Sequence, residues 1–405
     1  MRGYKNPVPY DVVILGGCGH VGLPLGISFA NAGLQVALYD LDEGRKAQVR
    51  AGEMPFIEYG ADELLRGTIG KTLHVVDGPE GLSEAEFAVI TIGTPIDEYL
   101  NPRHGPLFDL VTGIAPHLRA RQHVVLRSTV FPGTTRELKR HLASLDVDVN
   151  LTYCPERIAQ GYAITELDRL PQIVSGFDDE SVATALSLFG RIAERTLVVD
   201  VEEAELAKLF LNSWRYIQFA IANQFFMMAE EHGADFFRIH RAMTEGYDRA
   251  ADFPLPGFTA GPCLLKDTMQ LSALAPNGFQ LGQAAMQVNE GLTNFIVGQL
   301  RERYDLRAST VGILGMAFKG NIDDTRDSLA FKLRKLLAFH GARVLASDAF
   351  ASDPSFVPVE RLLAESDVIV IGAPHDAYRE LTFPPGREVV DVWGFLPRTR
   401  VEAPA

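Results

Sequence analysis

A cysteine in a chain that uses few of them is the first candidate for chemistry. Cys263 is one of three cysteines in 405 residues, and it follows a loop rich in glycine and proline, LPGFTAGP. Lys266 and Asp267 come within the next four residues. A nearby cation favours the thiolate, which is the nucleophilic form of cysteine. Most lone cysteines are buried structural residues, and spacing alone leaves that alternative open.

Three polar residues share one face of a long helical pattern, which starts near residue 202 and reaches Gly233. Glu205, Lys208 and Asn212 stand at i, i+3 and i+7, so a helix places them on the same side. Spacing alone favours a solvated face with a Glu–Lys ion pair, which contributes little to stability. A helix of this length typically joins domains or forms the core of a dimer.

Residues 11–40 predict a strand, a glycine-rich turn, a helix that ends at Gly33, and a second strand that ends at Asp40. The turn GGCGHVG fits G-x-G-x-x-G, so its backbone can approach a pyrophosphate at the helix N-terminus. An acid after the second strand can hold the ribose hydroxyls, which favours NAD over NADP. The predicted NAD contacts in this unit are Gly17, Gly19, His20, Val21, Gly22 and Asp40.

Polar residues follow several later strands of the same predicted sheet. Apolar runs at 87–95, 123–130, 149–156 and 172–176 alternate with helical segments or loops, as a doubly wound α/β sheet requires. Ligands bind at the carboxyl edge of such a sheet. Turn chemistry explains any one polar strand end, but several at one edge indicate a site. The residues at these ends are Thr94, Pro95, Thr129, Glu156 and Arg157, of which the Glu156 carboxylate could act as a base.

The C-terminal third repeats the theme of the N-terminal unit. In residues 309–348, VGILG and Asp348 correspond to VVILGG and Asp40, but the full glycine motif is missing. Further strands are expected at 368–374 and 388–394. The pattern predicts a second Rossmann-like domain that does not bind a dinucleotide in the same way as the first.

The composition narrows the class of protein. Hydrophobic residues make up 47% of the chain and charged residues 22%, which is ordinary for a globular protein. A formal charge of −14 argues against nucleic acid or an anionic membrane as the main partner. No membrane span or cleavable leader is expected, which favours the cytoplasm. The ten histidines show no metal-ligand spacing, and no metal is expected.

The order of these motifs resembles that of the nucleotide-sugar 6-dehydrogenase family, which includes UDP-glucose and UDP-N-acetylhexosamine dehydrogenases. The motifs are GGCGHVGLPLG, TPID (94–97), RSTV (127–130), CPER (154–157), ELAKLFLN (205–212), GPCLLKD (261–267) and GMAFKGNIDDTRDS (315–328). The resemblance implies an α/β homodimer with two Rossmann-like doubly wound domains joined by a long-helix dimerisation segment. The implied domains are an NAD-binding domain at 1–201, a helical central domain with the catalytic cysteine at 202–300, and a UDP-sugar-binding domain at 301–405.

The resemblance gives Cys263 a role in a four-electron oxidation. Converting a sugar CH₂OH to a carboxylate takes two hydride transfers to NAD, and the aldehyde between them must be held. A cysteine can attack that aldehyde to form a thiohemiacetal, which a second hydride transfer converts to a thioester. Water then releases the uronic acid.

Other positions match residues with roles in the family. Lys208 resembles a lysine that assists proton removal, and Asn212 an asparagine that hydrogen-bonds the reacting oxygen. Asp267 resembles an aspartate that positions a water, with Thr129 in support, and Glu156 a glutamate of the hydrolytic half. Lys266 and Arg326 join Thr94, Pro95 and Thr129 as implied cofactor contacts. The implied substrate contacts are Glu156, Arg157, Lys208, Asn212, Arg249, Phe258, Gly261 and Lys319.

Departures from the family pattern bear on the sugar. The CPER motif and the fourteen-residue gap from Arg249 to Cys263 are closer to the N-acetylhexosamine branch. Lys266 and Asp267 are closer to the UDP-glucose branch. We therefore expect a UDP-N-acetylhexosamine such as UDP-N-acetylmannosamine (UDP-ManNAc), with UDP-glucose as the alternative. A single-step hydroxyacid-type dehydrogenase and a non-catalytic NAD-binding protein are the remaining alternatives.

Overall fold

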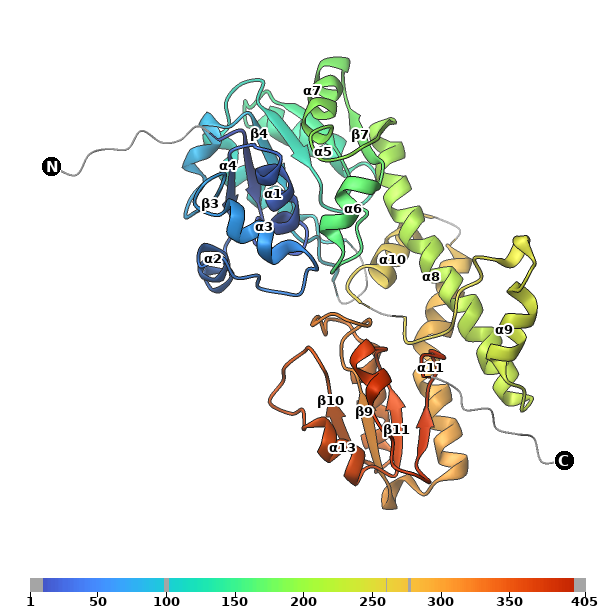
Figure 1. Ribbon diagram of the computed structural model, residues 1–405. Coiled ribbons are helices and arrows are strands. Elements are labelled where there is room, and N and C mark those ends of the chain that lie inside the picture. The colour runs from blue at the N-terminus through green and yellow to red at the C-terminus, as the bar shows by residue number, and fades with distance from the viewer. Residues whose placement is uncertain (1–9, 98–101, 260, 276–277, 397–405) are drawn as a thin grey trace. The chain divides into compact units, whose positions relative to one another are not determined.

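The computed structural model describes residues 10–97, 102–259, 261–275 and 278–396. They form two compact units, unit 1 up to Phe210 and unit 2 from Leu211 onward, and each unit has its own sheet (Figure 1). The prediction of two Rossmann-like sheets is confirmed, while the division into three domains stays a prediction. Within the described ranges, no helix is long and apolar enough to cross a membrane.

The sheet of unit 1 has eight strands in the order β3-β2-β1-β4-β5-β6-β7-β8. The chain runs out from β1 to β2 and β3, then returns to the other side of β1 with β4, so the strand order reverses between β1 and β4. In such sheets ligands bind where the order reverses. The strands are β1 (Val12–Leu15), β2 (Val36–Tyr39), β3 (Leu73–Val76), β4 (Phe87–Ile90), β5 (His123–Leu126), β6 (Asn150–Tyr153), β7 (Gln172–Gly176) and β8 (Thr196–Val198).

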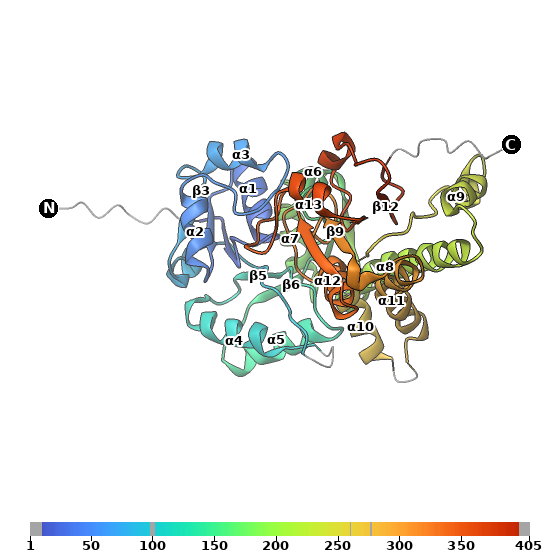
Figure 2. The same cartoon turned by 90° about the horizontal axis from the view of Figure 1, so that it is seen from below.

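Helices cover both faces of this sheet because alternate strand residues point to opposite sides. Val12 and Ile14 pack with α1, α2, α3, α6 and α7, whereas Val13 and Leu15 pack with α4 and α5. Figure 2 shows α4 and α5 together on one side of β5 and β6. The helices are α1 (Gly22–Asn31), α2 (Glu43–Arg50), α3 (Ala61–Thr68), α4 (Gly105–Ile114), α5 (Thr134–Ser144), α6 (Ala163–Arg169) and α7 (Asp179–Phe189).

Two details of unit 1 differ from the pattern expected of a doubly wound parallel sheet. The strand at 172–176 forms as predicted, but β7 pairs with β6 in the antiparallel direction. Strands β4, β5 and β6 also end several residues before the predicted runs do. The residues beyond these strand ends, such as Thr94, Thr129 and Glu156, therefore lie in loops at the carboxyl edge.

Unit 2 has a four-stranded parallel sheet in the order β10-β9-β11-β12, so its strand order reverses between β9 and β11. Helices α11 and α12 pack on one face through Leu292 and Leu333, and α13 packs on the other through Leu362. The strands are β9 (Thr310–Leu314), β10 (Arg343–Ser347), β11 (Val368–Ile371) and β12 (Glu388–Val390). Helix α8 (Val201–Glu231) begins in unit 1 and continues into unit 2. The other helices of unit 2 are α9 (Phe236–Thr244), α10 (Leu264–Leu274), α11 (Gln280–Arg303), α12 (Leu329–Phe339) and α13 (Val359–Glu365).

Candidate active site

The glycine-rich loop of unit 1 leaves space at one of its three motif glycines. A Cβ on Gly17 would stand 2.8 Å from the carbonyl oxygen of Ile14, and one on Gly22 2.4 Å from that of Gly16. A Cβ on Gly19 would meet nothing closer than 3.4 Å. The fold itself therefore requires Gly17 and Gly22, whereas the space beside Gly19 suits a ligand. Helix α1 begins after Val21 with no side-chain cap and no acid in its first turn, which suits an anion.

Asp40 lies directly after β2, beside this loop. Its carboxylate accepts hydrogen bonds from the backbone N–H of Cys18 (2.9 Å) and of Asp42 (3.0 Å). The residue is partly exposed, so its remaining lone pairs can accept from a ligand hydroxyl. The His20 ring lies 4.0 Å from that of Phe56, and its Nδ1 lies 3.1 Å from Gln160 Nε2.

The loops after β1, β4 and β5 meet at the reversal point of the sheet. The Thr91 hydroxyl donates to the carbonyl oxygens of Leu15 (2.9 Å) and Gly16 (3.1 Å). The Thr94 hydroxyl donates to the carbonyl oxygen of Thr129. The predicted NAD contacts Thr94 and Thr129 are therefore adjacent, and Pro95 follows Thr94 in the same loop.

Glu156 is held by a buried arginine of the motif RSTV, to which the sequence analysis gave no role. Arg127 follows β5 and pairs with Glu156 Oε2, while Glu156 Oε1 accepts from the backbone N–H of Arg157 (2.6 Å) and Ile158 (2.9 Å). The Arg127 guanidinium also lies 4.8 Å above the Phe189 ring. Both carboxylate oxygens of Glu156 thus have partners within unit 1. An arginine directly after a buried strand was the signal available in the sequence.

The solvated face expected for Glu205, Lys208 and Asn212 is wrong. Their exposed fractions are 0%, 8% and 4%. The Glu205 carboxylate accepts from the N–H groups of Gly133 (2.6 Å) and Thr135 (2.9 Å) at the start of α5, not from Lys208. Helix period shows which residues share a face, but it does not show what covers that face. Lys208 and Asn212, one turn apart on α8, are the residues of this face that remain for chemistry.

Cys263 is the exposed cysteine of the three, and it occupies the N-cap position of α10. Cys18 and Cys154 are buried, and burial raises the pKa of each thiol to about 12. A thiol with so high a pKa is almost entirely protonated at neutral pH and is a poor nucleophile. The exposure of Cys263 at a helix N-terminus suits a nucleophile.

Asp267 lies one turn after Cys263 on α10. Asn212 Nδ2 donates to Asp267 Oδ2 at 2.5 Å, and both side chains are buried. Lys266 Nζ lies 3.5 Å from Asp267 Oδ1, which accepts no hydrogen bond from the described residues. A buried carboxylate oxygen without a hydrogen bond is costly unless water or substrate supplies one.

The loop that leads to Cys263 is fixed by two asparagines that the sequence motifs also did not single out. The backbone of Gly257 exchanges two hydrogen bonds with the Asn223 side chain (2.8 and 3.1 Å), and Asn223 in turn donates to Asn289 (2.8 Å). The Phe258 ring is buried edge-on against Trp393, so any contact of Phe258 with a sugar is through its backbone. The signal for Asn223 was an amide in the apolar run AIANQFF.

The end of this loop packs against residues 315–328, which follow β9. Gly261 has φ +100, and a Cβ there would stand 2.6 Å from the Phe318 ring. Asp324 hydrogen bonds raise the pKa of Arg326, and the nearby Cys263 acts in the same direction. Arg326 is thus within range of an electrostatic interaction with Cys263. Lys319 lies in the same segment, whereas Arg249 lies exposed on a 3₁₀ turn (Asp248–Ala250).

Family models match nearly the whole chain. They are the NAD-binding, central and UDP-binding domains of the UDP-glucose/GDP-mannose dehydrogenase family, at residues 11–193, 202–291 and 312–397. The chain belongs to the UDP-glucose/GDP-mannose dehydrogenase family.

Named relatives of this family agree on the reaction class. A UDP-N-acetyl-D-mannosamine dehydrogenase of Methanocaldococcus jannaschii is 28% identical over 93% of this chain and 88% of that protein. A UDP-glucose 6-dehydrogenase of Bacillus subtilis is 28% identical over 83% and 79%. The structure of a UDP-D-ManNAc dehydrogenase from Pyrococcus horikoshii matches with a TM-score of 0.89 at 26% identity, over 96% of this chain and 97% of that one. The chain is an NAD-dependent nucleotide-sugar dehydrogenase.

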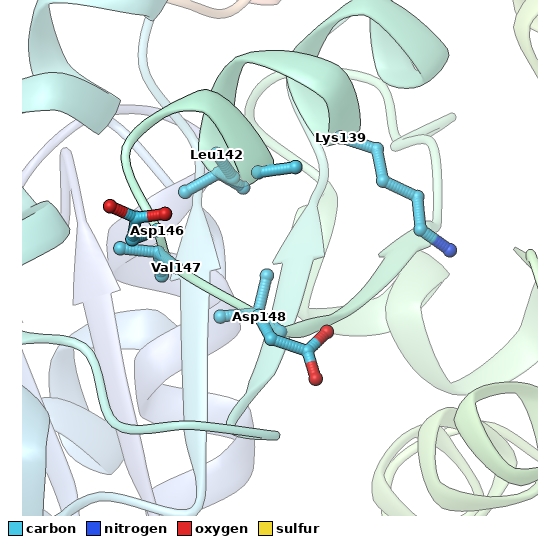
Figure 3. A pocket seen from close by; sticks show the side chains of 7 residues that line it. Lys139, Leu142, Asp146, Val147 and Asp148 are labelled. Carbon is cyan, nitrogen blue, oxygen red and sulfur yellow. The ribbon is translucent and has the colours of Figure 1, made fainter.

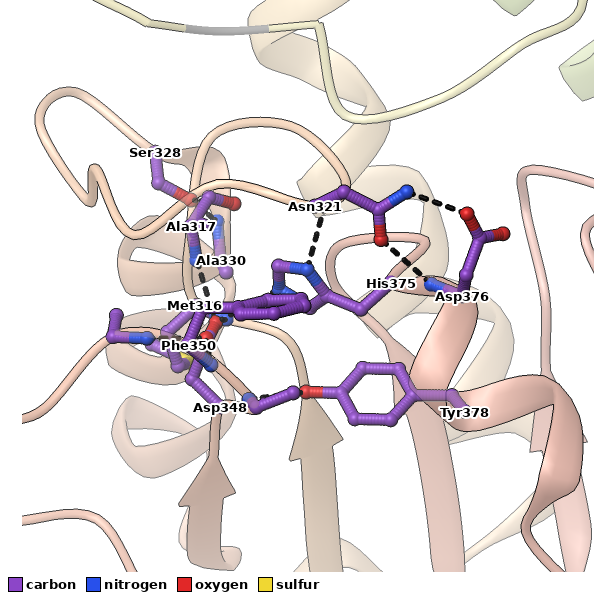
Figure 4. Close-up of polar contacts among 12 residues, drawn as sticks. Met316, Ala317, Asn321, Ser328, Ala330, Asp348, Phe350, His375, Asp376 and Tyr378 are labelled. Atoms are coloured by element: carbon purple, nitrogen blue, oxygen red, sulfur yellow. Dashed lines mark hydrogen bonds and ion pairs between the residues drawn. The ribbon is translucent and has the colours of Figure 1, made fainter. Parts of the chain in front are cut away.

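The second βαβ unit of this dehydrogenase has a different edge from the first. Asp348, after β10, accepts from the backbone N–H groups of Met316 and Ala317 and from His375 Nε2 (Figure 4). Both the Asp348 and the His375 side chains are fully buried. Asp348 cannot hold a ribose in the way expected of Asp40, and that this domain does not bind a dinucleotide in the same way as the first stays a prediction.

Unit 1 also has a surface hollow, away from the loops that follow β1, β4 and β5. It is lined by the end of α5 and the segment before β6, with Lys139, Asp146 and Asp148 at its rim (Figure 3). Because β6 starts there, the hollow is at the amino edge of the sheet, opposite the edge where ligands bind. It is not part of the candidate site.

Proposed function

We propose that the enzyme oxidises the C6 hydroxymethyl group of a UDP-N-acetylhexosamine, with UDP-ManNAc favoured, to a carboxylate through a covalent intermediate on Cys263. The observation that carries this proposal is an exposed cysteine at the start of α10, followed one turn later by a buried Asp267 that is bonded to Asn212. Relatives named as UDP-ManNAc dehydrogenases support the sugar, and the Bacillus subtilis relative keeps UDP-glucose as the second candidate.

NAD, when bound, accepts one hydride in each oxidation. Gly17, Gly19 and Gly22 would let its pyrophosphate approach the start of α1, and Asp40 would accept from a ribose hydroxyl. Thr94 and Thr129 lie at the same edge and would contact the remaining part of the dinucleotide.

The residues of the chain supply the proton and acyl chemistry. In the first oxidation Lys208 accepts the hydroxyl proton as C6 loses a hydride, and Asn212 donates to the oxygen. The Cys263 sulfur then bonds to the aldehyde carbon, and the oxygen takes a proton, which gives a thiohemiacetal. Loss of a second hydride from C6 and of that hydroxyl proton gives a thioester.

Hydrolysis completes the reaction. A water held by Asp267 Oδ1 adds to the thioester carbon, the C–S bond breaks, and the products are the carboxylate, a proton and the free thiol. The stoichiometry is two NADH per sugar and one water consumed. Both carboxylate oxygens of Glu156 already have protein partners, which suits this residue to hold the loop after β6 in place. Its effect on hydrolysis would come from positioning this loop.

The test is the yield of NADH per mole of nucleotide sugar, run to completion with UDP-glucose, UDP-N-acetylglucosamine and UDP-ManNAc. Two NADH from UDP-ManNAc is the expected result. One NADH would indicate a single-step dehydrogenase that releases the aldehyde, and none would indicate a non-catalytic protein or another nucleotide. Cys263→Ser is expected to lose at least about 1,000-fold in overall turnover, whereas Cys154→Ala, at a buried thiol, retains it.

We also propose that the enzyme is a homodimer through α8. Trp214, Ile221, Phe225 and Met228 are exposed and recur at intervals of seven, four and three residues, which places them on one side of the helix. An apolar stripe of this kind on a surface helix typically marks an interface. Light scattering at micromolar concentration is expected to give the mass of a dimer, and Phe225→Glu that of a monomer. A monomeric wild-type protein would contradict this proposal.

A further inference from the structure

A buried histidine in unit 2 has no part in the chemistry described above. His375 lies in the loop after β11, and its Nε2 is 3.1 Å from Asp348 Oδ2. Figure 4 shows the ring between Asp348 and the backbone of Asn321. Both side chains of the His–Asp pair are fully buried, so neither can contact a substrate directly.

The hydrogen bonds of the ring fix where its proton is. The backbone N–H of Asn321 donates to His375 Nδ1 at 2.9 Å, so Nδ1 is an acceptor and carries no proton. The proton is therefore on Nε2, which donates to Asp348. Burial opposes ionisation of Asp348, but His375 and backbone N–H groups outweigh it and lower the pKa of this carboxyl to about 2. The pair is thus a neutral imidazole aligned by a carboxylate.

The partners of this pair belong to the loop 315–328, on both sides of Lys319. Asp348 accepts from the N–H groups of Met316 (2.5 Å) and Ala317 (2.9 Å), before Lys319 in the chain. His375 accepts from the N–H of Asn321, two residues after it. Lys319 therefore stands between two anchored segments of backbone.

Asn321 is held in a conformation that the rest of the chain must maintain. Its φ is 61°, in the left-handed region that few residues other than glycine and asparagine adopt. Its side chain exchanges two hydrogen bonds with Asp376, at 2.6 and 2.8 Å, in addition to the backbone bond to His375. Such conformations persist where the surroundings over-determine them, and they cluster at binding sites.

We propose that His375 is a positioning residue for the nucleotide sugar: its Nδ1, aligned by Asp348, fixes Asn321 and so the placement of Lys319. The inference rests on the proposed function in one respect, that Lys319 contacts the nucleotide sugar. The match of residues 312–397 to a UDP-binding domain supports that contact. A lysine placed this way is a compact positive charge that suits a diphosphate.

Two substitutions separate the two hydrogen bonds of the ring. In His375→Asn the amide oxygen falls near the place of Nδ1 and can accept from Asn321, but it leaves Asp348 without a donor. In His375→Gln the amide nitrogen falls near the place of Nε2 and can donate to Asp348, but Asn321 loses its acceptor. We expect KM for the nucleotide sugar to rise about tenfold in H375Q and less than about threefold in H375N, with KM for NAD unchanged in both.

Tyr378→Phe is the matched control. The Tyr378 hydroxyl belongs to the same buried cluster, but it accepts from Ala349 N–H (3.1 Å) at the end of β10 and not from loop 315–328. Its loss is expected to reduce stability and leave both KM values unchanged. The proposal is overturned if H375Q keeps the wild-type KM for the nucleotide sugar, or if H375N and H375Q raise it equally.

Amide hydrogen exchange of the unliganded wild-type protein tests the same contact without depending on a variant that must fold. The Asn321 amide is expected to exchange at least about 100-fold more slowly than an unprotected amide, and exchange at the unprotected rate overturns the proposal. This readout also separates the two proposals. If no nucleotide sugar is oxidised but Asn321 is protected, the proposed function fails and the positioning contact stands. The Kd for UDP, measured by calorimetry, then replaces KM in the comparison of H375N with H375Q.

Discussion

The two βαβ units of this dehydrogenase share a frame and differ at one edge. In both, an aspartate follows the second strand, and it accepts from the first loop and from the N–H two residues further on: Asp40 from Cys18 and Asp42, Asp348 from Ala317 and Phe350. Asp348 differs in that it also accepts from the N–H groups of Met316 and Ala351 and from His375 Nε2. The carboxylate that is partly exposed in unit 1 is thus a buried anchor in unit 2.

The two sheets can be compared position by position in the loop that follows the central return strand, which is β4 in unit 1 and β11 in unit 2. Counting four residues past the last residue of the central return strand leads from Ile90 to Thr94 in unit 1 and from Ile371 to His375 in unit 2. Thr94 donates to Thr129 and leaves the acid accessible, whereas His375 covers it. The residue at this loop position therefore contributes to the burial of Asp348 in unit 2, whereas its counterpart in unit 1 does not contact Asp40.

The largest expected effect is a difference in protein stability between the asparagine variants of the two aspartates. Asp348→Asn places an NH₂ group against N–H donors and is expected to cost at least about 3 kcal/mol in the free energy of unfolding. Asp40→Asn, at a partly exposed site, is expected to cost about 1 kcal/mol or less but to raise KM for NAD. Urea unfolding followed by circular dichroism measures the stability of both variants, and tryptophan fluorescence reports on unit 2 alone, because Trp214 and Trp393 both lie there. Equal losses of stability in the two variants would contradict the distinction.

The same anchor predicts a pH dependence of stability in unit 2. Asp348 has a folded pKa of about 2, below the value near 3.9 of an unfolded chain, so its ionised form stabilises the native state above about pH 4. This contribution, about 2 kcal/mol, is lost as the pH falls from about 4 toward 2. The tryptophan-detected urea midpoint of the wild type should fall more steeply over this range than that of Asp348→Asn. Parallel curves for the two proteins would show that the partners of Asp348 do not lower its pKa in the folded state.

Much of this frame was predictable from the sequence, because buried parallel strands are short apolar runs that end in loops of glycine and polar residues. The partners of the polar side chains were less predictable. The partners of Glu205 are Gly133 and Thr135, some seventy positions away. Helix period carries no information on such partners, and it left Glu205 on a solvated face.

The positioning residues were missed for a related reason. Arg127, Asn223 and His375 act through other side chains or through loop backbone. Asn223 and His375 lie in none of the motifs, and RSTV contains Arg127 without giving it a role. A polar residue inside an apolar run, as in AIANQFF, indicates burial but does not name the partner. The roles proposed for Cys263 and Asp267, in contrast, rest on the resemblance of the motif GPCLLKD to the family pattern.

A smaller effect distinguishes the glycines of the first loop from one another. Gly19→Ala adds a methyl group that the protein accommodates, so stability should be unchanged, while KM for NAD should rise about tenfold because the methyl group occupies the space beside the pyrophosphate. Gly17→Ala is the matched comparison, since its Cβ would meet backbone and Leu38, and it should reduce stability. Thermal unfolding measures the stability of both variants, and initial rates at varied NAD concentration measure KM. An unchanged KM in Gly19→Ala would remove the evidence that this space belongs to the cofactor.

The smallest expected effect concerns a feature that the two units share, a glycine that ends the helix of each βαβ unit. Gly33 after α1 and Gly341 after α12 have φ +90 and +93, and the same two hydrogen bonds close each helix: Gly33 to Ala30 and Leu34 to Phe29, Gly341 to Ala338 and Ala342 to Leu337. Alanine is strained at such angles, so each Gly→Ala substitution should cost about 1 kcal/mol, and each Gly→Asn less, with kcat and both KM values unchanged. The cost at Gly341 should be slightly larger, because a Cβ there would stand 2.9 Å from Arg307 Cγ. Urea unfolding of the four variants measures this. A Gly33 variant that lost stability and also had a raised KM for NAD would contradict this prediction. It would show that the C-terminal end of α1 and the NAD-binding loop before α1 are coupled.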